Sequence, residues 1–337
     1  MDKKVSIIVL LYNSEKHLKE CLNSAINQSY QNLEVLAVVN GNCSDNTEFI
    51  ASEYAQSDSR IRVLKNTQNS VITEGLKLGF DNMQGEYFMI LEGDDELSLT
   101  AVKDLMDVAG DTDADMITGE INTISEAGDC IAIWGRPEFD ILSPVQYLKL
   151  AIPYMDFLYH GKLFRRKLYK DIMLPPAFLG HDVLITYQLA VNANKIVSCK
   201  KVVHYFRQHL SSVSMSTTLS RLNDSYTCHV LLDHLFREKN IYDDEEIRIL
   251  FETQILRILT SCLIFGKSVF YKNNKQAITR QLNNGTLDDK RCRAYLKAWK
   301  GVLFVLDIYR KMPTLANVIV YGVDFFRKIL LRIKRYH

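Results

Sequence analysis

The stretch GEYFMILEGDD, residues 85–95, decides the fold that the sequence predicts. Its apolar run at 87–91 has the length and composition of a buried β-strand, and four of the five residues at 92–96 are acidic. In open α/β folds, ligands bind at the edge of the sheet where such strands end. Carboxylates at that edge suit Mg²⁺ or Mn²⁺ held together with the phosphates of a substrate. A solvated acidic turn before a helix near Ser98 is the alternative interpretation.

The residues before this stretch alternate between strand and helix patterns. Apolar, β-branched runs predict strands at 5–11, 33–39 and 61–64, and amphipathic runs predict helices at 15–28, 47–55 and 73–83. This alternation predicts a parallel sheet with right-handed crossovers. No GxGxxG motif follows the first strand, which disfavours a dinucleotide-binding Rossmann domain.

The composition is that of a globular protein with an uneven distribution of charge. The 337 residues have a net charge of +1, but residues 1–150 hold 11 basic and 25 acidic side chains, whereas residues 151–337 hold 30 and 15. This asymmetry predicts an acidic, metal-binding part and a basic part that meets anions or a membrane surface. The seven scattered cysteines contain no CxxC pair, which favours reduced thiols. With no signal-peptide pattern and no long apolar run, we expect a cytoplasmic protein without a transmembrane helix.

An ordered set of motifs resembles the family 2 glycosyltransferases with the GT-A fold. The motifs are VSIIVLLYNSEKHLKECLNSAINQSYQNLEVLAVVNG, SDNT, GEYFMILEGDD, HGKLFRRKLY, GHDVLITYQLA and HYFRQHLSSVS. The resemblance implies an α/β GT-A domain, a mixed and mainly parallel sheet flanked by helices, over residues 1–215. Residues 216–337 then form an α-helical C-terminal extension.

The resemblance also implies an activity: inverting transfer of a sugar from a nucleotide-diphosphate donor to an acceptor hydroxyl. The leaving diphosphate requires a divalent cation, Mg²⁺ or Mn²⁺, and Asp94 and Asp95 match the metal-binding positions. Glu92 and Gly93 stand in the same motif, with Glu92 near the ribose or the metal. The acceptor hydroxyl requires a base, and Asp182 stands where the family carries its catalytic aspartate.

Further residues are implied to bind the nucleotide sugar. Those expected at the nucleotide are Tyr12, Asn13, Glu15 and Asn40. Those expected at the phosphates are Lys77, Arg207 and His209. Each assignment has a structural alternative: Tyr12 and Asn13 form only a turn, Asp182 is only the N-cap of a helix, and Arg207 and His209, together with His204, are ordinary surface residues.

The sequence departs from the family pattern at three single positions and one pair. Gly41 replaces the acidic residue that reads the uracil edge, which puts a preference for UDP in doubt. A longer carboxylate, Glu92, replaces an aspartate, and Leu76-Lys77 replaces an Arg-Asn pair. His181 replaces the glutamate before the base, and a protonated His181 would lower the pKa of Asp182.

These departures keep two other classes of function open. The first is a non-catalytic subunit of the same fold that binds a partner transferase or a glycan. The second is a nucleotidyltransferase, but the segment after the first strand, Leu11-Tyr12-Asn13-Ser14, lacks the Gly-rich, basic loop of that class. The retained Asp94, Asp95 and Asp182 favour an active transferase.

The C-terminal third has its own patterns. Helices are predicted at 219–239 and 245–271, and an Asn-rich polar loop with a short helix at 272–289. Residues 314–337 combine an apolar face with basic residues. This pattern predicts a helix on an anionic membrane surface, and a helix docked on the protein or in a homodimer is the alternative. We expect a glycan or lipid-linked acceptor at the inner face of the cell membrane, and no nucleic acid.

Overall fold

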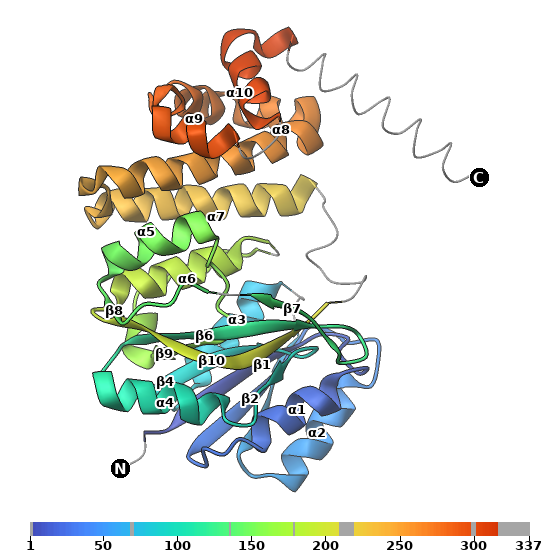
Figure 1. Cartoon of the computed structure of the whole chain (residues 1–337). Coiled ribbons are helices and arrows are strands. Elements are labelled where there is room, and N and C mark those ends of the chain that lie inside the picture. Colours follow the sequence, from blue (N-terminus) through green and yellow to red (C-terminus); the bar gives the residue numbers. More distant parts are fainter. Residues whose placement is uncertain are drawn as a thin grey trace. The chain divides into compact units, whose positions relative to one another are not determined.

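The computed structural model describes residues 3–67, 71–134, 136–177, 179–208, 219–297 and 301–315. The chain divides into two compact units, residues 1–215 and 216–337, and each unit is described by itself. In the described part of the first unit, ten strands form one mixed sheet in the order β3-β2-β1-β4-β9-β6-β10-β5, with β7 beside β6 and β8 beside β10 (Figure 1). The strands are β1 Val5–Leu11, β2 Leu33–Asn40, β3 Ile61–Asn66, β4 Tyr87–Glu92, β5 Glu96–Leu97, β6 Met116–Ile124, β7 Cys130–Trp134, β8 Ile141–Leu142, β9 Lys162–Arg165 and β10 Ile196–Arg207.

The first four strands are parallel, as the sequence predicts. Val5 of β1 pairs with Leu33 of β2 on one side and with Tyr87 of β4 on the other. Every residue of β1 and β2 is buried, because helices cover both faces of the sheet. The crossover helices are α1 Leu18–Ile26, α2 Thr47–Ser57 and α3 Ile72–Asn82. The carboxyl ends of β1, β2 and β4 therefore meet at one edge, where the acidic residues follow β4.

Two helical layers enclose this sheet. Helices α1, α2 and α4 (Ala101–Thr112) lie on one face, and α3, α5 (Pro144–Tyr154) and α6 (His181–Asn192) lie on the other (Figure 1). The approach of α3 is close enough to require a glycine, because a Cβ atom on Gly79 would lie 2.5 Å from Cγ2 of Ile8. The helices thus hold the strands from both sides.

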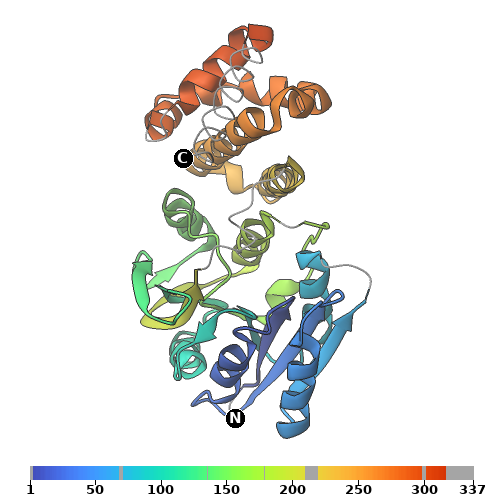
Figure 2. The same ribbon diagram turned by 90° about the vertical axis from the view of Figure 1, so that its right-hand side faces the viewer.

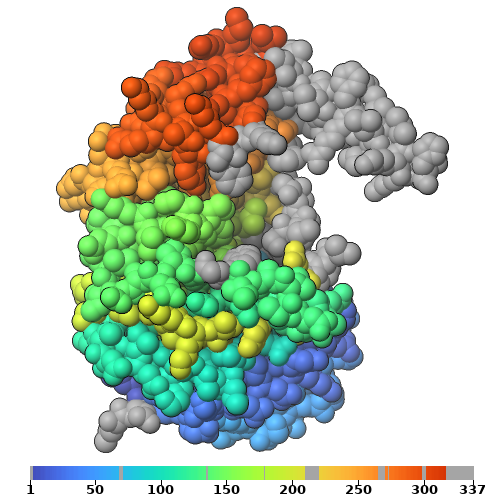
Figure 3. Space-filling model, in the orientation of Figure 1, coloured from blue at the N-terminus to red at the C-terminus, as the bar shows by residue number. Residues whose placement is uncertain are grey.

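The second half of the sheet brings β10 to the acidic loop. β9 runs antiparallel between β4 and β6, and β10 is parallel to β6 with register shifts between Ser198 and Val202 and between Val202 and His204. Lys200 and Lys201, between the paired residues Ser198 and Val202, are exposed. In Figure 3, β10 is the yellow band between the teal segment of α4 and the green segment that contains α5. Beyond the shifts, β5 pairs antiparallel with β10 through His204 and Tyr205. The residues after β4 are therefore attached to β10.

Asp156 is the centre of a buried charged cluster in this unit. Its Oδ1 atom lies 2.6 Å from Lys162 Nζ and 2.9 Å from Arg136 Nε, and Tyr147 donates its hydroxyl to Oδ2 at 2.9 Å. Burial and the nearby Arg136 lower the pKa of Lys162 to about 7, although Asp156 opposes the shift. The carboxylate thus compensates two buried cations, which are costly to leave unpaired.

The second unit is helical. Helices α7 (Leu219–Glu238) and α8 (Glu245–Leu282) pack side by side (Figures 1 and 2), and α9 (Lys290–Lys297) and α10 (Val302–Lys311) pack on α8. The prediction of a polar loop from residue 272 is wrong, because α8 continues to Leu282. Ile278 and Leu282, four residues apart, are buried, so the polar residues of this stretch occupy the outer face of an amphipathic helix.

The predicted basic and apolar helix at 314–337 lies outside the described residues beyond Leu315. Its membrane or dimer role therefore stays a prediction. Among the described helices, none combines the length and the apolar character that crossing a membrane requires.

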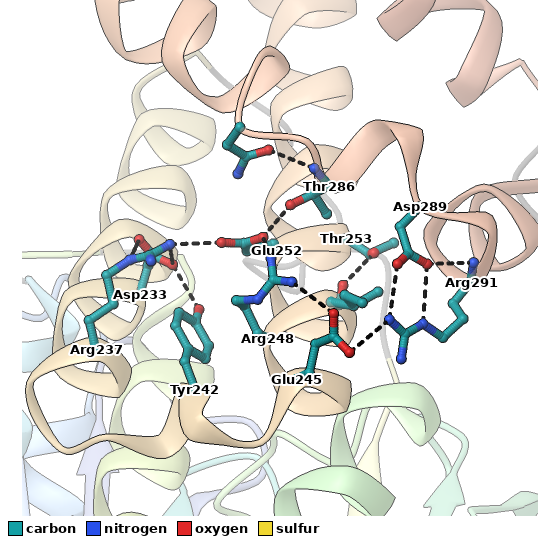
Figure 4. A network of polar contacts seen from close by, with 12 residues as sticks. Asp233, Arg237, Tyr242, Glu245, Arg248, Glu252, Thr253, Thr286, Asp289 and Arg291 are labelled. Carbon is teal, nitrogen blue, oxygen red and sulfur yellow. Dashed lines mark hydrogen bonds and ion pairs between the residues drawn. The ribbon is translucent and has the colours of Figure 1, made fainter.

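A polar network centred on Glu252 joins the elements of this unit (Figure 4). Glu252 is buried, and its carboxylate accepts hydrogen bonds from Arg237 of α7 at 2.7 Å, from Arg248 of α8 at 3.3 Å, and from the hydroxyl of Thr286. Tyr242, in the turn between the helices, donates to Asp233 at 2.7 Å. Glu252 therefore links α7, α8 and the turn before α9.

We expect Glu252→Gln to lower the free energy of unfolding by about 1–3 kcal/mol, because the neutral amide weakens two charge-assisted bonds to a buried carboxylate. Chemical denaturation followed by far-UV circular dichroism measures the change. Glu238→Gln, at an exposed position of α7, is the matched control and should change the free energy by less than about 0.5 kcal/mol. Equal effects of the two variants would contradict the central role of Glu252.

Candidate active site

Asp95 fixes the acidic loop to β10. It is 1% exposed, its Oδ1 atom accepts the backbone N–H of Arg207 at 2.8 Å, and its Oδ2 atom lies 2.8 Å from Nε2 of His204. Burial raises the pKa of Asp95 well above its usual value, and the neighbouring Asp94 and Glu92 add to the shift. Burial also lowers the pKa of His204. Asp95 is therefore held inside the protein, whereas Asp94 beside it is half-buried.

His160 lies against this pair. The ring is 5% exposed, and its Nε2 atom is 3.5 Å from Glu92 Oε1 and 3.9 Å from Asp95 Oδ2. Within the described part of the chain, neither ring nitrogen of His160 has a hydrogen-bond partner. A buried imidazole that faces two carboxylates without a hydrogen bond is suited to bind a cation.

Asp95, His160 and His204 fit a divalent transition metal. One ligand atom from each lies within 4.8 Å of the others, and all three residues are buried. A carboxylate with two imidazoles suits Mn²⁺ or Zn²⁺ better than Mg²⁺, which prefers oxygen ligands. The sequence pattern predicts a metal-binding role for Asp95 but for neither histidine, although His160 and His204 each begin one of the quoted motifs.

Tyr159 connects the acidic loop to α6. This fully buried side chain donates its hydroxyl to Glu92 Oε1 at 2.8 Å, and the same oxygen lies 3.1 Å from Nε2 of His181. Burial alone would raise the pKa of Glu92, but His160, His181 and Tyr159 outweigh it and lower the pKa to about 2. Burial lowers the pKa of His181, although the nearby Asp182 and Glu92 oppose the shift. Burial thus disfavours the protonated His181 that would lower the pKa of Asp182.

Asp182 lies in the first turn of α6. Gly180, just before the helix, has a φ of 83°, a backbone conformation that glycine adopts without strain. The Asp182 side chain is half-buried, and its Oδ1 atom accepts the N–H of Val183 at 2.8 Å. Among the described residues its second oxygen accepts no hydrogen bond. The carboxylate thus supports the start of the helix and keeps one oxygen available.

The predicted nucleotide-binding residues join two loops. Asn13, at a φ of 49°, accepts the N–H of Ser44 at 2.8 Å, and Glu15 accepts the N–H of Asn46 at 2.9 Å. Hydrogen bonds from Asn46 also lower the pKa of Glu15. Tyr12, next to them, is 48% exposed. The turn after β1 and the loop after β2 therefore form one rigid surface, with the Tyr12 ring open to solvent.

Asn40 and Lys77 each have partners within the fold. Asn40 is buried, donates to the carbonyl of Val71 at 3.1 Å and accepts from Asn66 at 2.8 Å. It thus ties the ends of β2 and β3 to the start of α3. Lys77 is exposed on α3 and forms an ion pair with Asp81. The structure does not bring Lys77 together with the acidic loop.

Arg207 is a support of the loop. It is 4% exposed, and its Nε atom donates to the carbonyl of Asp94 at 3.0 Å. Its Nη1 atom donates to the carbonyls of Ser125 and Glu126, and Nη2 pairs with Glu96. These contacts describe a structural role, and the predicted phosphate contact stays a prediction. His209 lies outside the described residues.

Gly93 is required where the acidic loop crosses the turn after β1. Its N–H donates to the carbonyl of Leu10 at 3.0 Å. A Cβ atom at this position would lie 2.7 Å from Ser14 Oγ and 2.8 Å from Leu11 Cδ2, closer than such atoms approach in proteins. The absence of a side chain thus sets the spacing between the acidic loop and the predicted nucleotide-binding turn.

We expect Gly93→Ala to destabilise the protein by about 1–3 kcal/mol, because the added methyl group overpacks this crossing. Thermal unfolding measures the change. Gly110→Ala is the matched control, since a Cβ atom there meets nothing within 4 Å on α4. That variant should gain about 0.5–1 kcal/mol from the better helix propensity of alanine. A neutral Gly93→Ala would show that the crossing tolerates a side chain.

The family model described as "Glycosyl transferase family 2" matches residues 6–173. The matched segment contains β1 to β9, the acidic loop, Tyr159 and His160. The chain belongs to glycosyl transferase family 2. The sequence resemblance is thereby confirmed, and so is the predicted mainly parallel sheet flanked by helices.

Individual proteins support this assignment. Glycosyltransferase GlyA of Streptococcus pneumoniae serotype 4 is 26% identical over 248 residues, which cover 69% of this chain and 34% of GlyA. The chain thus spans about a third of that relative's length. The S. aureus TarS 1-349 structure in complex with UDP-GlcNAc has a TM-score of 0.66 and 19% identity, and the match covers 94% of this chain and 89% of TarS 1-349. The mannosyltransferase PcManGT from Pyrobaculum calidifontis, in complex with GDP-Man and Mn²⁺, has a TM-score of 0.53 and 13% identity over 93% of this chain and 88% of PcManGT. These two likenesses show the shared GT-A fold.

Proposed function

We propose that this protein is an inverting glycosyltransferase. It moves a sugar from a nucleotide-diphosphate donor to a hydroxyl of a glycan or lipid-linked acceptor in cell-surface polysaccharide synthesis. The observation that carries the proposal is the gathering of the acidic loop and the first turn of α6 around Tyr159, which touches both Glu92 and His181. One site then offers carboxylates for the donor side and Asp182 for the acceptor side.

The donor side is formed by the acidic loop. When bound, a divalent cation would neutralise the charge that develops on the leaving diphosphate. We assign this cation to Asp94, which is half-buried, and to Asp95, which lies with His160 and His204. These two histidines favour Mn²⁺ over Mg²⁺. The Mn²⁺ of PcManGT, which has the same fold, is consistent with this choice.

The acceptor side is formed by Asp182. The acceptor oxygen attacks the anomeric carbon, the bond from this carbon to the diphosphate oxygen breaks, and the hydroxyl proton passes to Asp182 as general base. Attack opposite the leaving group inverts the configuration of the anomeric carbon. The half-buried position of Asp182 and its unused carboxylate oxygen support this role.

The nucleotide is assigned to the surface formed by the turn after β1 and the loop after β2. The exposed ring of Tyr12 offers a face on which a base can stack, and Asn13 and Glu15 hold the two loops together. Gly41 has no side chain to read the base, and its N–H is already donated to the carbonyl of Asn66 at 2.8 Å. Binding of different nucleoside diphosphates therefore has to determine which base the site prefers.

The lipid-linked acceptor is supported by the sequence of residues 314–337. Their apolar and basic pattern fits the surface of an anionic membrane. We propose that the enzyme works at the inner face of the cell membrane, where nucleotide sugars and lipid carriers meet.

We expect a nucleoside diphosphate and Mn²⁺ together to raise the melting temperature, because a ligand that binds only the folded state stabilises it. A panel of nucleoside diphosphates, with and without metal, identifies the base. Asp182→Asn should retain this shift and lose release of nucleoside diphosphate from the matching donor by at least about 100-fold. Asp94→Asn should lose the shift itself.

Asp107→Asn, at an exposed position of α4, is the control and should behave as the wild type. Wild-type turnover by Asp182→Asn would refute the assignment of the base. If no nucleoside diphosphate shifts the wild type with any metal, the non-catalytic alternative, a subunit that binds a partner transferase or a glycan, replaces the enzyme.

A further inference from the structure

A single buried hydroxyl lies between the two halves of the active site. The Tyr159 oxygen is 2.8 Å from Glu92 Oε1, at the end of β4, and 3.1 Å from His181 Nε2, at the start of α6. We propose that Tyr159 is a positioning residue that holds the acidic loop and the first turn of α6 in one register. Its consequence for catalysis rests on the proposed function, whereas the contact itself does not.

The two contacts fix where the protons lie. A phenol has one proton, and an ionised carboxylate can only accept. Tyr159 therefore donates to Glu92, and His181 must supply the proton of the second contact from Nε2. The other nitrogen of His181, Nδ1, is buried and has no hydrogen-bond partner within the described ranges. Tyr159 is thus the polar contact that determines which ring nitrogen of His181 carries the proton.

The Tyr159 ring is held so that the hydroxyl cannot turn away. The residue is 0% exposed, and its ring centroid lies 4.6 Å from that of His160 and 5.8 Å from that of His181. His160 also faces Glu92 Oε1 at 3.5 Å. A displacement of the Tyr159 ring would therefore move groups on both sides of the site.

The link reaches the proposed base through the backbone. His181 is the first residue of α6 and is 8% exposed, so its ring anchors the helix start. Asp182 follows it directly. The position of Asp182 relative to the acidic loop is consequently set by two hydrogen bonds to one oxygen. Glu92 has the length that this contact needs, and a shorter aspartate would withdraw the acceptor by about one carbon–carbon bond.

A matched control exists in the same unit. Tyr147 is 1% exposed and donates its hydroxyl to the carboxylate of Asp156 at 2.9 Å. The two tyrosines thus share burial and a tyrosine–carboxylate bond. Asp156 pairs with Lys162 and Arg136. These cations donate to the carbonyls of Leu158 and His160, so Tyr147→Phe also controls for a general disturbance of the backbone that carries Tyr159. A change that Tyr159→Phe causes and Tyr147→Phe does not is therefore specific to the position of Tyr159.

The first test needs no activity. Histidine-selective ¹⁵N labelling and long-range ¹H–¹⁵N spectra report which ring nitrogen is protonated, with the His181 signals assigned from a His181→Gln variant. We expect a proton on Nε2 of His181 in the wild type, a changed pattern in Tyr159→Phe, and the wild-type pattern in Tyr147→Phe. A proton on Nδ1 alone, or an unchanged pattern in Tyr159→Phe, would overturn the proposal.

The second test measures the coupling. Release of nucleoside diphosphate is compared for Glu92→Asp, His181→Gln and their combination, in the wild type and in Tyr159→Phe. We expect Tyr159→Phe to lower the rate constant about 10- to 100-fold, as for the loss of a bond to a charged group, and Tyr147→Phe to stay within about twofold. In the wild-type background, the effects of Glu92→Asp and His181→Gln on the activation free energy should be non-additive. In the Tyr159→Phe background, which lacks the hydroxyl, the two effects should add.

The outcomes separate the two proposals. Additive effects in both backgrounds would refute the coupling in an active enzyme. A wild type that neither binds nor cleaves a nucleotide sugar would refute the proposed function, and the spectra would still decide whether Tyr159 bridges Glu92 and His181.

Discussion

The bond between Asp95 and β10 is the contact on which the site depends. In the sheet, β4 and β10 are separated by β9 and β6, so the loop after β4 cannot reach β10 through strand pairing from β4 itself. Asp95 links the loop to β10, because one of its carboxylate oxygens accepts the N–H of Arg207 and the other contacts Nε2 of His204. Arg207 returns the contact by donating to the carbonyl of Asp94. These bonds let a loop of consecutive acidic residues adopt one conformation despite their mutual repulsion.

Burial of charge has a recurring solution in this protein. Isolated ionised groups are costly away from water, and two buried carboxylates of this protein are each paired with two cations. Asp156 compensates Lys162 and Arg136 in the first unit, and Glu252 compensates Arg237 and Arg248 in the second. In the active site, His160 Nε2 faces Glu92 at 3.5 Å and Asp95 at 3.9 Å, and neither ring nitrogen has a hydrogen-bond partner among the described residues. We propose that this imidazole is a ligand of the cation.

The fold shows which contacts the residues that depart from the family pattern make. Glu92 and His181 share one partner, Tyr159, so the longer carboxylate and the imidazole belong to one arrangement. A carboxylate in place of His181 would have no proton to offer to a hydroxyl that already donates to Glu92. Lys77 is paired with Asp81 on the outer face of α3. Gly41, by contrast, leaves one position of the nucleotide surface without a side chain.

The sequence by itself determined the parallel half of the sheet, the acidic edge and the family, because apolar runs and short motifs are local signals. The prediction of a loop from residue 272 was wrong, because the many polar residues of this stretch obscure the helical spacing of the buried Ile278 and Leu282. The sequence assigned no role to His160, His204 or Tyr159, which contact residues 65 or more positions away along the chain. Those contacts follow from the order of β9, β6 and β10 in the sheet. The tertiary structure alone decided them, because strand order and register are set by packing across the whole unit.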